Sequence, residues 1–115
     1  MARLFTIWRD GEALFTRAKV ARDPLSRMLG LLPRTGLDPA EAMIFPRCRS
    51  LHTYFMRFAI DIFFLEEMGR VIELLSAVPR GKLVFGGAEA HTAVECRAQG
   101  AAARGIAPGQ ILTWG

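Results

Sequence analysis

Near the start of the chain, two runs of alternating apolar and polar residues flank an Asp-Gly pair at residues 10–11. Alternation with a period of two is typical of a strand with one buried face. Asp-Gly favours a two-residue turn between strands, because Gly tolerates positive φ. The pattern therefore predicts a β-hairpin in which Arg9 lies opposite Glu12. In the same register, Ile7 lies opposite Leu14.

The apolar spacing then changes to that of a helix. Asp23 can cap a helix, Pro24 suits its first turn, and Pro33 ends it. The apolar residues between them are three or four positions apart, so they share one helical face. The segment is predicted as a short amphipathic helix packed on a sheet. The residues of this face are Leu25, Met28, Leu29 and Leu32.

The rest of the chain is predicted mainly as strands separated by turns. A second hairpin is expected over residues 59–79, with its turn at residues 68–69 (Met-Gly) and a Gly-rich loop after it at 79–87. Further strands are expected at 43–45, 50–58, 90–97 and, after a Pro-Gly turn, 107–114. Short helical segments are expected at 38–41 and 98–105.

Strands dominate this pattern, and the hairpin connections are too short for parallel crossovers. The expected fold class is therefore α+β and strand-dominated. We expect a mostly antiparallel sheet, curled into a barrel or half-barrel, with about two short helices against it.

Length and composition fit one folded domain over residues 1–115. Apolar residues make up 51% of the chain and charged residues 23%, which excludes disorder as the main state. No apolar run approaches the roughly 18 residues of a membrane span, and the N-terminus does not resemble a secretory signal. We expect a cytoplasmic protein. Cys48 and Cys96 are then expected as buried, reduced thiols rather than a disulfide.

The net charge of +4 comes from 15 Lys and Arg against 11 Asp and Glu, and Arg predominates among the basic residues. Arg side chains suit phosphates and carboxylates, but an Arg-rich codon usage would give the same composition. The basic residues are dispersed and match no nucleic-acid-binding motif. Nucleic acid is therefore not expected as a partner.

Two charged residues, Arg57 and Asp61, interrupt the apolar stretch YFMRFAIDIFFLEE at residues 54–67. A buried charge is costly without a partner. The register of the second hairpin places Asp61 opposite Ser76 at the margin of the core. Arg57 lies roughly 13 Å away on a straight strand, so the two meet only if the chain bends near Ala59. We favour framework charges over a functional site.

Asp61, His52 and Glu95 are the candidate catalytic residues, because a carboxylate and an imidazole can exchange protons with a substrate. His91 is predicted on the same strand face as Glu95. No spacing of His, Cys, Asp and Glu is typical of a metal site, so no metal and no other cofactor is expected. The sequence also lacks a nucleophile elbow and a phosphate-binding loop.

Three blocks of the sequence, SRMLGLL, AMIFPRCRSLHTYFMRFAIDIFFLEEMGRVI and AVECRAQGAAARGIAPGQIL, together resemble the family named domain of unknown function 192. The resemblance covers almost the whole chain and implies a small β-rich domain with short helices; it implies no activity, cofactor or substrate. Two positions depart from the family pattern: Ala59, where relatives often have Pro, and Met68 before Gly69, where they often have Asp. Many relatives carry an export signal, and none is expected for this chain. The recurring positions of the family match at Gly30, Leu31, Met56, Asp61, Glu95 and Gly100.

These observations favour a non-enzymatic binding module over an enzyme. An Arg-edged, concave apolar surface would bind an anionic small molecule, a peptide or a protein, with Arg57, Phe55 and Arg49 as the expected binding residues. One alternative is a small hydrolase or lyase that uses Asp61, His52 and Glu95. Another is a small RNA-binding barrel with exposed aromatic and Arg side chains. No membrane partner is expected.

Overall fold

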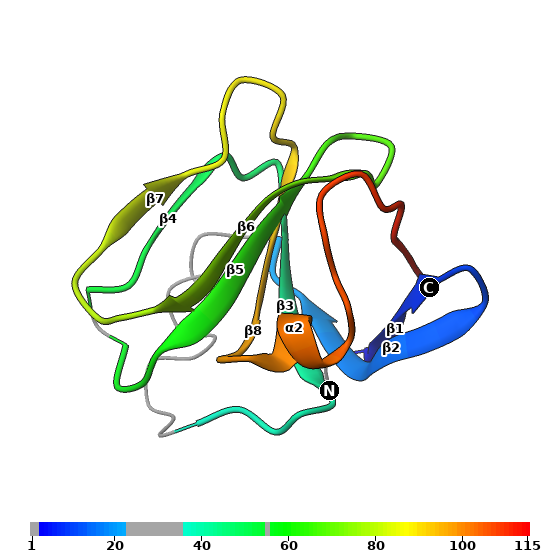
Figure 1. Cartoon of the computed structure of the whole chain (residues 1–115), viewed down its shortest axis with the longest axis horizontal. Coiled ribbons are helices and arrows are strands. Elements are labelled where there is room, and N and C mark those ends of the chain that lie inside the picture. Colours follow the sequence, from blue (N-terminus) through cyan, green and yellow to red (C-terminus); the bar gives the residue numbers. More distant parts are fainter. Residues whose placement is uncertain (1–2, 23–35, 55) are drawn as a thin grey trace.

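The computed structural model describes residues 3–22, 36–54 and 56–115. Seven strands form one sheet in the order β6-β5-β8-β3-β2-β1-β9, and β4 pairs with β7 in a second sheet (Figure 1). The elements are β1 (Phe5–Arg9), β2 (Glu12–Val20), β3 (Glu41–Pro46), β4 (Ser50–His52), β5 (Ile60–Leu65), β6 (Val71–Val78), β7 (Leu83–Phe85), β8 (Thr92–Arg97), α2 (Gly100–Ala103) and β9 (Thr113–Trp114). The helix predicted after residue 23 lies outside the described residues.

The first hairpin turns at residues 10–11, as predicted, and both residues have positive φ. Arg9 pairs with Glu12, also as predicted. Ile7 lies opposite Phe15, one residue beyond its predicted partner Leu14. The reason is an irregularity in the ladder between Ile7 and Trp8. Such bulges insert a residue into one strand and leave the other unchanged.

The strand-dominated prediction is confirmed, but the large sheet is mixed and is not closed into a barrel. β2 and β3 are parallel, whereas the other pairs are antiparallel. The prediction overlooked that residues 21–40 are long enough for a crossover connection between these two strands. Within the described part of the chain the only helix is α2, in the segment predicted at 98–105.

The strand predicted over 50–58 is shorter, because regular pairing ends after β4. Its partner β7 falls in the predicted loop at 79–87. Three-residue strands with Gly on both sides resemble loops in sequence, which explains the missed strand.

The second hairpin, β5 and β6, pairs Phe63 with Leu74 as predicted. Its turn has Gly69 at φ 94, and the ladder is irregular near each end. One irregularity places two residues, Ser76 and Ala77, across from Asp61. This bulge determines the surroundings of Asp61.

Apolar side chains pack on both faces of the large sheet. On one face Phe63, Val94 and Cys96 pack with Ala101 of α2. On the other face Phe64 packs in the cluster that contains Cys48, with Leu51 and Val84 of the small sheet against it. The two cysteines are buried on opposite faces and form no disulfide with each other. Among the residues described, no helix is both long and apolar enough to cross a membrane.

Candidate functional site

Two connections meet at the end of the sheet where β3 stops: residues 47–49, which lead into β4, and residues 86–91, which lead into β8 (Figure 1). The Cys48 amide donates to the His91 carbonyl oxygen at 2.9 Å. The Gly86 amide donates to the Arg49 carbonyl oxygen at 2.8 Å. The main chains of the two connections are therefore fixed against each other.

The connections border an open hollow of about 400 Å³, lined by Arg47, Arg49, Ala90 and His91. Nε of Arg49 donates to the Ala90 carbonyl oxygen at 3.3 Å, which orients the guanidinium. Among the described residues, its two Nη groups make no further hydrogen bond. The His91 ring is held by a hydrogen bond between Nδ1 and Oγ1 of Thr92 at 3.1 Å.

Arg47 has a φ of 54°, a left-handed conformation that is strained for residues with a side chain. Residues in such conformations persist where the surroundings fix them, and they cluster at functional sites. Both Arg47 and Arg49 are exposed to solvent. The hollow is lined by two guanidinium groups and an imidazole, and none of the four lining residues described is a carboxylate. It is therefore a donor-rich site for an anion.

Asp61, the charge inside the apolar run, is completely buried on β5. Its Oδ1 accepts hydrogen bonds from the amides of Ala77 at 2.8 Å and Gln99 at 3.1 Å. Its Oδ2 accepts one from the Ala101 amide at 3.1 Å. The carboxylate therefore joins the bulge of β6 to the first turn of α2.

Both amides on Oδ1 belong to residues in the left-handed region, with φ 48° at Ala77 and 70° at Gln99. Gln99 is the N-cap residue of α2, yet its side chain makes no capping bond. Asp61 supplies that bond from another strand, because N-terminal helix amides need an acceptor. Arg57 is exposed, and no ion pair between described residues joins it to Asp61. The geometry gives Asp61 a framework role.

Glu95 is the second buried carboxyl candidate, with 5% of its surface exposed. It lies on β8 between Met43 and Ile62 of the neighbouring strands. Within the described residues, its side-chain carboxyl makes no hydrogen bond. Burial raises the pKa of Glu95 from 4.5 to about 7. Asp61 pairs instead with Cys96, so the two carboxyl groups point to opposite faces of the sheet.

His52 is exposed on the small sheet, where its ring stacks on Tyr54 with centroids 5.1 Å apart. The structure thus separates His52 from both Asp61 and Glu95, and it does not bring the three catalytic candidates together. Nor do three His, Cys, Asp or Glu side chains of the described ranges gather in a way that could hold a metal ion.

Of the two expected binding residues that the structure describes, Arg49 lines the hollow and Arg57 does not. Arg57 precedes the first residue of β5. His91 lies at the other end of that strand, where its amide donates to the Leu65 carbonyl oxygen at 2.8 Å. Phe55 lies outside the described residues. Sequence reasoning missed Arg47; two Arg side chains separated by one residue, directly after a predicted strand, were the available signal.

The DUF192 family model, described as "Uncharacterized ACR", matches residues 5–114. The chain belongs to this family. No curated protein matches it. Of the positions at which the chain resembles the DUF192 pattern, Asp61 and Gly100 meet at the start of α2, because Asp61 bonds the amides on both sides of Gly100.

Two solved structures share the DUF192 fold. One is a protein of unknown function from Novosphingobium aromaticivorans, with a TM-score of 0.81, 24% identity, and alignment over 96% of this chain and 83% of that chain. The other, from Sinorhizobium meliloti, is described as a putative transcription regulator and has a TM-score of 0.81. It is 18% identical, with alignment over 96% of this chain and 91% of that chain.

Burial also makes the Cys96 thiol unreactive. Burial first, and then the neighbouring Asp61 charge, raises the pKa of Cys96 to about 12. The thiolate is the nucleophilic form of cysteine. Cys96 is therefore a packing residue at neutral pH rather than a nucleophile.

Proposed function

We propose that this DUF192 protein is a non-enzymatic binding module for an anionic small molecule, bound in the hollow formed by Arg47, Arg49, Ala90 and His91. The observation that supports this proposal most directly is the grouping of two guanidinium groups and an imidazole around one hollow of about 400 Å³. That volume falls in the range typical of small-ligand sites.

The chemistry of the lining favours a carboxylate or phosphate ligand. A guanidinium presents donors in a planar fork that matches the oxygen pairs of both groups. Arg49 is already oriented through its Nε bond to Ala90. The ligand therefore meets at least one pre-positioned donor, which reduces the entropy lost on binding.

The proposal can be tested by NMR titration of the protein with inorganic phosphate and, separately, with succinate. We expect saturable shifts of amides in residues 47–49 and 86–91 for at least one of the two probes. Arg49→Gln and Arg47→Asn should weaken that binding; Asn tolerates the left-handed conformation of residue 47. Arg57→Gln is the matched control, because it removes an exposed Arg from the other end of β5.

Equal binding by the parent and by the Arg47 and Arg49 variants would refute the proposal, as would an absence of saturable shifts with both probes. A loss with Arg57→Gln alone would place the ligand at the other end of the sheet. The S. meliloti neighbour prompts one further measurement with a duplex oligonucleotide. Tight binding that weakens steeply with salt would indicate a nucleic-acid partner instead.

We also propose that the protein works in a reducing compartment, the cytoplasm. The support is the burial of Cys48 and Cys96 on opposite faces of the sheet, where they cannot stabilise the fold as a disulfide.

A further inference from the structure

Within the described residues, β7 has a backbone edge with which no strand pairs. The Thr53 amide donates to the Lys82 carbonyl oxygen, and the Gly86 amide donates to that of Arg49, both at 2.8 Å. Hydrogen-bonded pairs alternate along an antiparallel ladder. The amides and carbonyls of Leu83 and Phe85 therefore point away from β4, toward an edge on which no strand of the described residues pairs.

Leu83 and Phe85 also expose their side chains, with 52% and 68% of their surfaces accessible. Val84 between them faces the core, so the two exposed side chains share the outer face of the sheet. Their cross-strand partners there are His52 and Ser50, which are exposed as well. The edge thus combines unpaired backbone groups with an apolar outer face.

Proteins usually protect such edges with charged or inward-turned side chains, or they use them to bind another strand. β7 is short, yet its two outward side chains are large and apolar rather than charged. The charges nearest to it precede the strand: Arg80 and Lys82 are both exposed. Glu89 is the acidic residue of the following loop.

We propose that β7 is a docking edge for an extended, acidic peptide segment of a partner protein. The peptide adds as a strand beside β7 and bonds the backbone of Leu83 and Phe85. Alternate apolar side chains of the peptide pack beside the same two residues on the outer face. Its acidic residues reach Arg80 and Lys82 at the start of the strand. The free backbone edge favours an extended segment over a helix, and the two basic residues before β7 favour an acidic one.

The test is selection of random ten-residue peptides displayed on phage, with the Leu83→Glu/Phe85→Glu variant for counter-selection. We expect enriched peptides that carry acidic residues and alternate apolar positions. Synthetic copies should bind the parent with micromolar affinity and bind the variant about tenfold or more weakly, as for loss of an interface hot spot. Ile111→Glu, which changes an exposed apolar residue elsewhere (58% accessible), should leave binding unchanged.

Backbone pairing is tested by N-methylation of the selected peptide at single positions. Methylation of residues whose amides face β7 should abolish binding, whereas methylation of the alternate residues should not. Enrichment no greater for the parent than for the double variant would overturn the proposal. Equal sensitivity to methylation at all positions would also overturn it. Concentration-dependent self-association of the parent, lost in the double variant, would show that the edge pairs with a second copy instead.

Discussion

At the scale of single residues, Asp61 holds the main chain of two segments that are far apart in sequence. Its carboxylate accepts three backbone amides, two of them from residues with positive φ. Removal of the carboxylate leaves buried amides without an acceptor. Each such amide lowers the free energy of unfolding, because its lost hydration is no longer compensated by a hydrogen bond.

Asp61→Ala should therefore lower the free energy of unfolding by about 3 kcal/mol. Asp61→Asn keeps one carbonyl oxygen, so its loss should be smaller. The measurement is the urea midpoint of each variant. Glu73→Ala, at an exposed position of β6, is the control and should change stability by less than about 0.5 kcal/mol. An unchanged or higher midpoint for Asp61→Ala would favour a functional charge kept at the expense of stability.

Glu95 should make stability depend on pH. Between pH 4.5 and 7 the folded state holds a proton that the unfolded state has released, because burial raises the pKa of Glu95 to about 7. The free energy of unfolding therefore falls as pH rises through this window, by about 3 kcal/mol at roughly 1.4 kcal/mol per unit. Glu95→Gln, which stays neutral, should remove this dependence.

Urea unfolding at pH 5 and pH 8 measures the effect. The Gln variant should be more stable than the parent at pH 8, and the two should be similar at pH 5. Glu73→Gln is the matched control and should keep the pH dependence of the parent. The same dependence in Glu95→Gln as in the parent would show that Glu95 does not cause it.

At the scale of elements, the sequence allowed prediction of what depends on neighbouring residues. The Asp-Gly turn and the Phe63–Leu74 pairing followed from turn chemistry and alternation. The bulges and the parallel pairing of β2 with β3 were not predictable, because they depend on contacts between distant segments. The same holds for the hollow: Arg49 was a candidate by residue type, but its closeness to His91 requires the two connections to meet.

Two turn glycines have different surroundings. Both Gly11 and Gly69 have positive φ, which disfavours any residue with a Cβ. A Cβ at Gly11 would meet no atom within 4 Å. A Cβ at Gly69 would lie 2.3 Å from the Leu112 carbonyl oxygen, where the turn packs on the C-terminal segment.

Gly11→Ala should therefore destabilise the protein by about 1 kcal/mol, the conformational cost alone. Gly69→Ala adds a clash with main-chain atoms and should lose at least about 3 kcal/mol. Thermal unfolding of the two variants, compared with the parent, separates conformational cost from clash. Equal losses would mean that the turn moves away from Leu112 without penalty.

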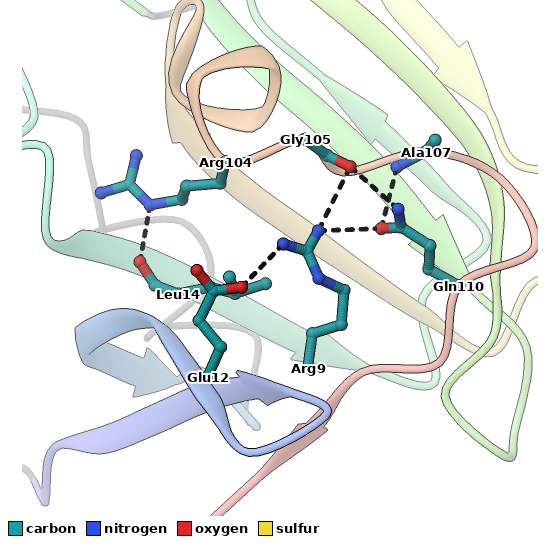
Figure 2. Close-up of polar contacts among 7 residues, drawn as sticks. All are labelled: Arg9, Glu12, Leu14, Arg104, Gly105, Ala107 and Gln110. Carbon is teal, nitrogen blue, oxygen red and sulfur yellow. Dashed lines mark hydrogen bonds and ion pairs between the residues drawn. The ribbon is translucent and has the colours of Figure 1, made fainter.

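At the scale of the whole molecule, side chains join the N-terminal hairpin to the C-terminal segment. Arg9 donates through Nη1 to the Gly105 carbonyl oxygen at 3.2 Å and to Oε1 of Gln110 at 3.1 Å (Figure 2). Gln110 in turn donates to the same Gly105 oxygen and accepts from the Ala107 amide. With β9 paired to β1, both ends of the chain form one edge of the large sheet.

Arg104 makes the widest set of such contacts. Its Nε donates to the Leu14 carbonyl oxygen at 2.6 Å (Figure 2). Its Nη1 donates to the Gly100 carbonyl oxygen at 3.1 Å. Its Nη2 donates to the Pro39 carbonyl oxygen, and the guanidinium lies 4.3 Å above the centre of the Phe15 ring. One side chain thus connects β2, the segment before β3, and α2.

Arg104→Lys should lower the free energy of unfolding by about 2 kcal/mol, although it preserves the charge. An ammonium group cannot bond three carbonyl oxygens in a planar fork and also stack flat on the ring.

Arg70→Lys is the matched control, because the Arg70 side chain is half exposed and bonds only that of Glu66 among the described residues. Urea unfolding gives the energies, and amide exchange in β2 and β3 shows where the loss is felt. We expect faster exchange in both strands, since Arg104 holds β2 against the segment that leads into β3. Parent-like exchange and stability in Arg104→Lys would mean that the sheet order is maintained by backbone pairing and apolar packing alone.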